Sequence, residues 1–227
     1  MAPAAELIDA HLTYPSAAGD VHALRGVSYV FHRGSKTAVV GRSGSGKSSL
    51  IAVLALLRTP TRGEVVVDGS RVRELPAKDI ARLRGRKIGV VFQSFHLDAA
   101  ETAAANVMLP WVFQGRASRK TARCRAHEVL EQLGIGHLGG ALPHQMSGGQ
   151  RQRVAIARSL FPRPRILIAD EPTGNLDEET ANQVAGDLYA LADSHDTAVI
   201  VVTHDPDIAT MATDTIQLRQ GKIVTDL

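Results

Sequence analysis

The sequence predicts an α/β fold in which a mixed, mainly parallel sheet is flanked by helices. Parallel strands that are buried on both faces read as short, continuous apolar runs. Such runs lie at Thr37–Val40, Ile88–Phe92, Ile166–Ala169 and Ala198–Val202. The last two runs are joined by a segment whose apolar residues have helical spacing, which is the pattern of a strand–helix–strand unit.

The length and composition are those of one globular unit. The chain has 227 residues, of which 44% are hydrophobic and 22% are charged, so wholesale disorder and a membrane-embedded chain are excluded. We expect a single domain over residues 1–227, in which residues 1–92 and 161–227 form the β-rich region and core, and residues 94–160 form an inserted helical subdomain. Neither a membrane-spanning stretch nor a secretory signal is recognised, so a cytosolic location is expected.

The N-terminal third is expected to be rich in strands and to contain an antiparallel β subdomain. Apolar and polar residues alternate over Ile8–Tyr14 and Val27–Phe31, which is the period of half-buried strands. A turn is expected at His32–Ser35. Glu64–Val67 reads as a further strand, closed by the turn Asp68–Gly69.

A helical pattern follows between the second and third apolar runs. Ala117–Leu133 lacks Gly and Pro and places its apolar residues on one face of a helix. The densest basic patch, Arg116–Arg125, has no interleaved aromatic residue, so a solvated helix face is favoured over a nucleic-acid site. Cys124 stands alone, which excludes an intramolecular disulfide and indicates no metal cluster.

The C-terminal third continues the sheet. Between the last two apolar runs, a helix is indicated by the spacing of Ala181, Val184, Leu188 and Leu191. The final segment, Ile216–Val224, has a Gln-Gly turn at its centre and predicts a terminal hairpin.

The segment Gly41–Ser48 fits the pattern GxxxxGK[ST] and lies after a predicted buried strand and before a helix expected to start near Lys47. Its glycines allow backbone N–H groups to turn inward around phosphate oxygens, with a helix dipole behind them. We expect Lys47 to neutralise the β- and γ-phosphates and the Ser48 hydroxyl to ligate Mg²⁺. The sequence therefore predicts a nucleoside triphosphate site.

A second part of such a site is indicated by Asp170 and Glu171, which end an apolar strand at the edge of the sheet. Asp170 is expected to hold the Mg²⁺ shell, and Glu171 to orient and deprotonate an attacking water. On its own, this pattern equally fits an ordinary strand end without catalytic carboxylates.

The segment Ser147–Gln150 opens a predicted helix over Arg151–Leu160. A serine or glycine cap with free N–H groups directed outward is a second device for binding phosphate. Spacing alone leaves open whether this cap meets the same phosphate as Lys47, and the segment also fits a plain helix cap after a loop.

These motifs, in this order, resemble those of the ABC transporter ATPases, and the resemblance extends over nearly the whole chain. Met146–Gln150 is similar to the LSGGQ signature of the family, with methionine in place of leucine, a change that conserves volume. The resemblance implies the ABC ATPase fold: a P-loop NTPase core with an N-terminal antiparallel β subdomain and an inserted α-helical subdomain. It also implies that the signature of one subunit closes over the nucleotide held by the P-loop of another.

Further roles follow from the resemblance. Tyr14 is similar to the aromatic residue that stacks on adenine, and Gln93 to the glutamine that touches Mg²⁺ or the attacking water and senses the membrane partner. Asn175–Asp177 is similar to the D-loop, which crosses between subunits, and His204 to the switch histidine that contacts the γ-phosphate.

The resemblance thus implies four sets of site residues. The catalytic set is Glu171, His204, Gln93 and Lys47. The ATP contacts within one chain are Tyr14, Gly41, Arg42, Ser43, Gly44, Ser45, Gly46, Lys47, Ser48 and Ser49. The contacts from the second chain are Ser147, Gly148, Gly149, Gln150 and Asp177. The Mg²⁺ set is Ser48, Gln93 and, through a water molecule, Asp170.

Within the family, Val91–Phe95, Asn106–Val107 and Asp170–Asp177 are similar to the lipoprotein-release, macrolide-export and cell-division group, the LolD, MacB and FtsE type. That group couples ATP to four-helix permeases. The stretch His96–Ala105 departs from the group pattern, which usually has a Leu-Pro-containing turn and an acidic residue in this region facing the permease.

The expected function is an ATP-binding and hydrolysing subunit of a transporter or mechanotransmission complex. The implied cofactors are ATP and Mg²⁺. The implied partners are a second copy of the chain, joined on ATP binding, and a separate transmembrane permease of the FtsX, LolCE or MacB type, which places the chain on the inner face of the cell membrane. Nucleic acid is not an expected partner, since the net charge is only +3.

Two alternatives are weighed against this function. One is a soluble ABC ATPase in cofactor assembly or nucleic-acid maintenance, although the segment between Gln93 and Ser147 is too short for the coiled-coil or zinc insertions of DNA-repair members. The other is a subunit that binds nucleotide without hydrolysis, against which the presence of Lys47, Glu171 and His204 argues.

Overall fold

The computed structural model describes residues 3–17, 19–113 and 118–224. Within these ranges the N-terminal strands form an antiparallel sheet with the order β2-β1-β4-β5. Its strands are β1 (Pro3–Tyr14), β2 (Val21–His32), β4 (Arg62–Val67) and β5 (Ser70–Arg71). The predicted antiparallel β region is therefore present.

The second sheet has the order β10-β9-β3-β8-β7-β6. Its strands are β3 (Lys36–Val40), β6 (Ile88–Phe92), β7 (Ile166–Asp170), β8 (Ala198–Val202), β9 (Asp214–Arg219) and β10 (Lys222–Val224). Every pairing from β9 to β6 is parallel, and β10 pairs antiparallel with β9 as the terminal hairpin. The mixed, mainly parallel sheet that the sequence predicts is confirmed.

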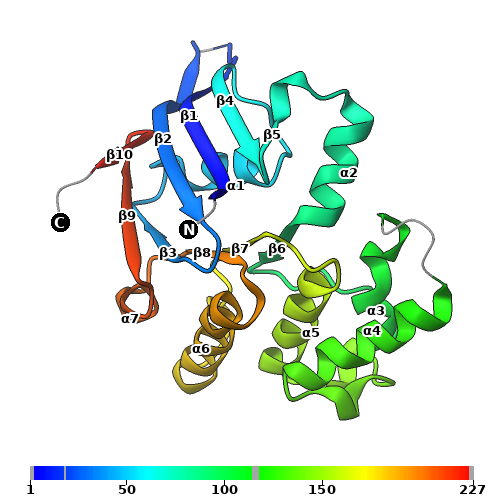
Figure 1. Ribbon diagram of the computed structural model, residues 1–227. Helices are drawn as coiled ribbons and strands as arrows, with labels where there is room; N and C mark the ends of the chain where they lie inside the picture. Colours follow the sequence, from blue (N-terminus) through cyan, green and yellow to red (C-terminus); the bar gives the residue numbers. More distant parts are fainter. Residues whose placement is uncertain (1–2, 18, 114–117, 225–227) are drawn as a thin grey trace.

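One group of helices lies apart from strands β9 and β10 (Figure 1). The α-helices are α1 (Lys47–Leu54), α2 (Ala77–Lys87), α3 (Ala103–Met108), α4 (Arg119–Gln132), α5 (Gly148–Leu160), α6 (Glu178–His195) and α7 (Pro206–Thr210). The 3₁₀ turns are η1 (Val72–Glu74), η2 (Leu109–Phe113), η3 (Gly136–Leu138) and η4 (Pro143–Gln145). Helices α3, α4 and α5 come between β6 and β7 in the chain and gather at the end of the molecule away from β9 and β10 (Figure 1).

Strand β7 explains why the central strands read as continuous apolar runs. Ile166 and Ile168 pack into a core shared with the antiparallel sheet and α1, whereas Leu167 and Ala169 pack into a second core formed with the helices of the opposite face. All four side chains are fully buried. Burying a large aliphatic side chain contributes about 1.5–3 kcal/mol, so both faces of the strand hold the sheet between its two covering layers.

The expected burial of Ile8 is wrong. The residue is 37% exposed, whereas Leu7 and Ala10 are buried. The register of β1 against β2 shifts between Leu7 and Ala10, and Asp9 between them has a φ of 45°. A bulge inserts an extra residue, which moves the buried face by one position and turns Ile8 outward.

The helical region differs from the prediction in two details. Helix α4 begins at Arg119 because the Ser118 hydroxyl caps it by accepting the N–H of Thr121; the predicted start at Ala117 lies outside the described residues. Within the basic patch, Arg116 also lies outside them, and Arg125 is not solvated as expected. Its side chain is only 14% exposed, and its Nη2 donates to the Leu160 carbonyl at 3.3 Å.

Helix α2 was not predicted. None of its residues is fully buried, and its apolar stripe consists of Ile80 and Leu83, which pack against the core from within a mostly charged segment.

Candidate nucleotide site

The Gly41–Ser48 loop joins β3 to α1 at the carboxyl edge of the parallel sheet. Gly46 caps the helix with a φ of 109°, and a Cβ added there would lie 2.5 Å from the Ala23 carbonyl oxygen. Only glycine fits this close approach of the loop to the end of the antiparallel sheet. The loop is anchored further by the Gly221 N–H, which donates to the Ser45 carbonyl at 2.8 Å.

Lys47 lies folded over this loop. Its Nζ donates to the Gly41 carbonyl at 2.6 Å and to the Arg42 carbonyl at 3.2 Å. The ammonium group is thus held where the loop would receive an anion, and a phosphate oxygen can replace either carbonyl as a stronger, charged acceptor.

Two hollows flank the loop. One, of about 810 Å³, is lined by Tyr14 together with Lys47, Ser48 and Ser49. The other, of about 400 Å³, is bounded by Gly41–Ser45 and by the end of β9. The larger hollow lies within the size range of small-ligand sites. It therefore brings the predicted stacking ring and the predicted phosphate loop to one place.

The strand end at Asp170 and Glu171 lies at the same edge. Burial and the neighbouring Glu171 charge raise the pKa of Asp170, while Lys47 acts to lower it, so the lysine and this carboxylate are within electrostatic reach. Glu171 has a left-handed φ of 46°, and its N–H donates to the Val202 carbonyl of β8 at 2.9 Å. A residue other than glycine rarely adopts the left-handed backbone conformation, and such residues are found preferentially at functional sites.

His204 follows β8 and meets this strand end. Its Nδ1 lies 2.9 Å from Glu171 Oε1. Residues from the ends of two adjacent parallel strands are thereby joined, because both strands finish at one edge of the sheet.

Gln93 contacts the loop that follows Glu171. A Cβ on Gly174 would lie 2.7 Å from Gln93 Nε2, and Asn175 Nδ2 donates to the Gln93 carbonyl at 3.0 Å. Asp177, at the end of this loop, caps α6. The Thr180 N–H donates to its Oδ1 at 3.0 Å and lowers the pKa of the carboxyl.

Ser147 caps α5 in a reciprocal arrangement. Its hydroxyl accepts the Gln150 N–H at 3.2 Å, and Gln150 Oε1 accepts the Ser147 N–H at 2.9 Å. The turn packs against the start of α6, since a Cβ on Gly149 would lie 2.5 Å from Thr180 Cγ2. The described structure thus places the signature-like turn beside the D-loop-like segment and not among the residues that line either hollow at the P-loop.

Sequence reasoning missed other residues around the larger hollow. Asp20, His22, Arg25 and Gln220 also line it. They are scattered singly in the loop before β2, in β2 itself and in the terminal hairpin, and they carry no motif from which a single sequence could reveal them.

Comparison with known proteins settles the family. Residues 24–174 match the ABC transporter family. The chain belongs to this family. An ABC transporter ATP-binding protein of Thermotoga maritima is 40% identical over 218 residues, which cover 96% of this chain and 92% of that protein.

A macrolide export ATP-binding/permease protein, MacB of Chlorobium luteolum, is 43% identical over 224 residues, covering 99% of this chain and 33% of that protein. MacB of Escherichia coli K12 is 42% identical over the same length and is covered to 34%. The ABC transporter chain therefore spans about a third of the length of these MacB relatives.

Solved structures confirm the predicted fold of this ABC transporter chain. The dimeric ABC transporter cassette MJ0796 matches with a TM-score of 0.86 and 36% identity over 96% of both chains. The same cassette in a dimeric post-hydrolysis state with ADP and Pi matches with a TM-score of 0.87. Among the helices of the described residues, none has the length and apolar character that a bilayer crossing requires.

Proposed function

We propose that the chain is an ATP-binding and ATP-hydrolysing cassette whose active site is completed by a second copy of the same chain. The observation that carries this proposal is the division of the motifs. Lys47 and Tyr14 share one hollow, and Asp170 reaches Lys47 electrostatically, whereas the Ser147–Gln150 turn lines neither hollow at the P-loop of its own chain. A second chain can supply that turn.

The hollow beside the P-loop suits ATP in its two parts. Tyr14 offers an aromatic face for adenine, and stacking on a base contributes about 1–3 kcal/mol. Gly41–Ser49 offers backbone N–H groups, the Lys47 ammonium and hydroxyl groups for the phosphates.

The residues present also fit Mg²⁺. Ser48, Gln93 and Asp170 provide hydroxyl, amide and carboxylate oxygens, which are the hard ligands that Mg²⁺ prefers. Within the described residues no cluster of three or more His, Cys, Asp or Glu could hold a metal by itself, which agrees with an ion held partly by substrate phosphates. Bound there, Mg²⁺ would offset the negative charge of the phosphates, and Asp170 would orient its water shell.

Hydrolysis is assigned to Glu171 and His204. Glu171 is the candidate base that accepts a proton from the attacking water, and His204 is the candidate donor to the γ-phosphate. A positioned general base contributes about 10²–10⁴-fold to a rate. Gln93 contacts the loop after Glu171, so its position can respond to nucleotide bound at this edge of the sheet.

The contacts expected from the second chain are the Ser147–Gln150 turn and Asp177. Both lie at helix N-termini, where backbone N–H groups favour an anion. Since Gly149 packs on Thr180 at the start of α6, the turn and the D-loop segment can approach a partner as one surface.

A mixing experiment tests the two-chain site. Lys47→Ala disables the phosphate loop, and Ser147→Arg disables the signature turn, so each variant alone should hydrolyse ATP at a small fraction of the parental rate. Mixed in equal amounts, they form heterodimers with one intact composite site, and activity should return to up to about a quarter of the parental value. No recovery in a mixture shown by cross-linking to contain heterodimers would contradict the proposal.

We further propose that the chain works with a separate transmembrane permease, on the inner face of the cell membrane, as a transport or mechanotransmission subunit. The MacB relatives are macrolide export proteins with an ATP-binding and a permease part, which supports an export-type role. The division into a core of residues 1–92 and 161–227 and a helical subdomain of residues 94–160 remains part of this proposal.

Affinity purification of the chain from solubilised membranes tests the partner. Recovery of a four-helix permease supports the transport role. Exclusive recovery of cytosolic assembly factors or nucleic-acid proteins would instead favour a soluble ABC ATPase.

A further inference from the structure

A cavity of about 570 Å³ lies at the opposite edge of the parallel sheet from the nucleotide site. Lys87, Arg165 and Thr197, which line it, directly precede β6, β7 and β8, so the cavity sits at the amino ends of these strands. The remaining lining residues come from the end of α2, the end of α5 and the loop that follows it, and the end of α6: Arg86, Leu160, Pro162, Arg163, Pro164 and His195. Five of the nine lining residues are thus Arg, Lys or His, and none of those described is acidic.

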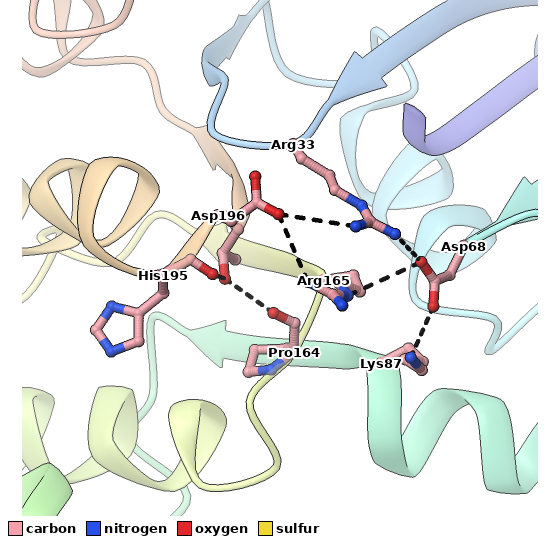
Figure 2. Close-up of polar contacts among 8 residues, drawn as sticks. Arg33, Asp68, Lys87, Pro164, Arg165, His195 and Asp196 are labelled. Carbon is pink, nitrogen blue, oxygen red and sulfur yellow. Dashed lines mark hydrogen bonds and ion pairs between the residues drawn. The ribbon is translucent and has the colours of Figure 1, made fainter. Parts of the chain in front are cut away.

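Two carboxylates beside the cavity are shared among several cations (Figure 2). Asp68 accepts Arg33 at 2.6 Å and Lys87 at 2.7 Å, and Arg165 lies 3.9 Å away. Asp196 lies 3.7 Å from Arg33 and 3.6 Å from Arg165. Three cations therefore share two carboxylates, and the network by itself does not neutralise the cavity wall.

Arg163 adds a charge that this network does not reach. Within the described residues its side chain forms no ion pair and no hydrogen bond. In Figure 2 the imidazole of His195 likewise points away from the Asp68 and Asp196 network.

The loop that carries Arg163 is held in place. Pro162 and Pro164 flank the arginine, whose φ is 55°. Its N–H donates to the Leu160 carbonyl at 2.9 Å, and the buried Thr197 hydroxyl donates to the Pro164 carbonyl at 2.8 Å. A cation on a fixed backbone loses less entropy when it binds a ligand, so the site is pre-organised.

The electrostatic environment agrees with an excess of positive charge. Burial lowers the pKa of His195, and the charges of Arg125 and Arg163 lower it further. Burial and the Arg163 charge also lower the pKa of Arg125. The Arg163 charge thus acts on both groups, although Glu128, 3.4 Å from Arg125, acts to raise the pKa of Arg125.

We propose that this cavity is a binding site for a small soluble anion that carries phosphate groups with at least two negative charges. Guanidinium groups from Arg163 and Arg165 present planar donors suited to phosphate oxygens. The cavity volume is that of a small-ligand site, and its walls of leucine and proline leave the polar recognition to the cations. The ligand would offset the positive charge that Asp68 and Asp196 do not neutralise.

Calorimetric titration with pyrophosphate tests the proposal. The titration uses the Lys47→Ala chain, in which phosphate binding by the P-loop is weakened by loss of the ammonium group. One pyrophosphate site should remain, and adding Arg163→Asn should weaken it about tenfold, the equivalent of about 1.4 kcal/mol. Asparagine accepts the left-handed backbone at this position, so the loop is retained. The matched control is Arg58→Asn, at an exposed arginine outside the cavity, which should leave the affinity unchanged.

Proton NMR of the His195 ring gives a second measurement, with the signal assigned from His195→Gln. Pyrophosphate should raise the pKa of His195, because the bound anion offsets Arg163 and Arg125. Absence of binding to the Lys47→Ala chain, or binding that is insensitive to Arg163→Asn and leaves His195 unchanged, would overturn the proposal.

A vesicle arm separates a soluble phosphate from a lipid headgroup. Co-sedimentation with phosphatidylglycerol vesicles should be the same for the parental chain and for Arg163→Asn. Vesicle binding that depends on Arg163 in the absence of pyrophosphate binding would overturn the assignment to a soluble anion.

Discussion

His204 Nδ1 lies 2.9 Å from Glu171 Oε1, although the two side chains differ sharply in exposure: 75% for the histidine and 18% for the glutamate. One carboxylate oxygen of Glu171 thus contacts the exposed imidazole of His204, while the backbone of Glu171 is hydrogen-bonded to β8. Closing a second chain over this edge would bury the imidazole without moving the carboxylate. The pair therefore has one fixed and one adjustable member.

Glu171→Gln should retain ATP binding and lose turnover. The amide can still accept a hydrogen bond from His204 but cannot accept a proton from water, so we expect the hydrolysis rate to fall by about 10²–10⁴-fold. The dimer should then accumulate in the presence of ATP. Size-exclusion chromatography detects the dimer, and phosphate release is measured in parallel. A variant that hydrolyses ATP at the parental rate would exclude Glu171 as the base.

His204→Ala should reduce turnover without affecting stability. The imidazole is 75% exposed, and exposed substitutions usually change the free energy of unfolding by less than about 0.5 kcal/mol. Loss of a donor to transferring phosphate typically costs about 10²–10³-fold in rate. Urea unfolding and steady-state hydrolysis measure the two effects separately. A large loss of stability with an unchanged rate would reverse the assignment.

Tyr14→Ala should weaken ATP binding by about 5- to 150-fold, which corresponds to the 1–3 kcal/mol of base stacking. Tyr14→Phe is the matched control, because it keeps the ring and removes only the hydroxyl. Calorimetry with ATP and with tripolyphosphate separates the contribution of the ring. If Tyr14→Ala weakens both ligands equally, the ring does not stack on the base.

The sequence was most informative where burial is two-sided. The residues of β7 and β8 pack into cores on both faces of the sheet, so continuous apolar runs identified these strands nearly residue by residue. Ile8 shows the limit of this reasoning, since the bulge at Asp9 changes the buried face of β1 without changing the composition. Helix α2 was missed because its apolar face is only the partly buried pair Ile80 and Leu83 within a mostly charged segment.

The site divides in the same way. The Gly41–Ser48 loop and the Asp170–Glu171 strand end could be proposed as site residues because each candidate group lies within one short segment. The network of Arg33, Asp68, Arg165 and Asp196 was not recognised, because each member is an ordinary charged residue near the end of an element. Only the fold brings the Asp68 turn, between β4 and β5 of the antiparallel sheet, beside the amino ends of the parallel strands.

Asp68→Asn should lower stability at neutral pH. The carboxylate is 15% exposed and accepts Arg33 and Lys87; its loss leaves Lys87 without a charged acceptor and Arg33 with only the more distant Asp196. Lys87 is the cation that loses its charged acceptor completely, so we expect the free energy of unfolding to fall by about 1–3 kcal/mol near pH 7. The matched control is Asp79→Asn, because its carboxylate is 43% exposed and pairs with Arg82 on α2, so the change should stay below about 1 kcal/mol.

The effect of Asp68→Asn should depend on pH in a defined direction. Burial acts to raise the pKa of Asp68, but hydrogen bonds and charges from Lys87 and Arg33 outweigh it, so the pKa is lowered in the folded chain. The folded chain then holds fewer protons than the unfolded chain around the unfolded pKa of about 4, and the stabilisation is fully present above that value. It is lost as pH falls through the lower, folded pKa. Urea unfolding at several pH values should therefore show the parental and Asp68→Asn curves converging below about pH 4, whereas a constant difference down to acid pH would mean that packing, and not charge, stabilises this position.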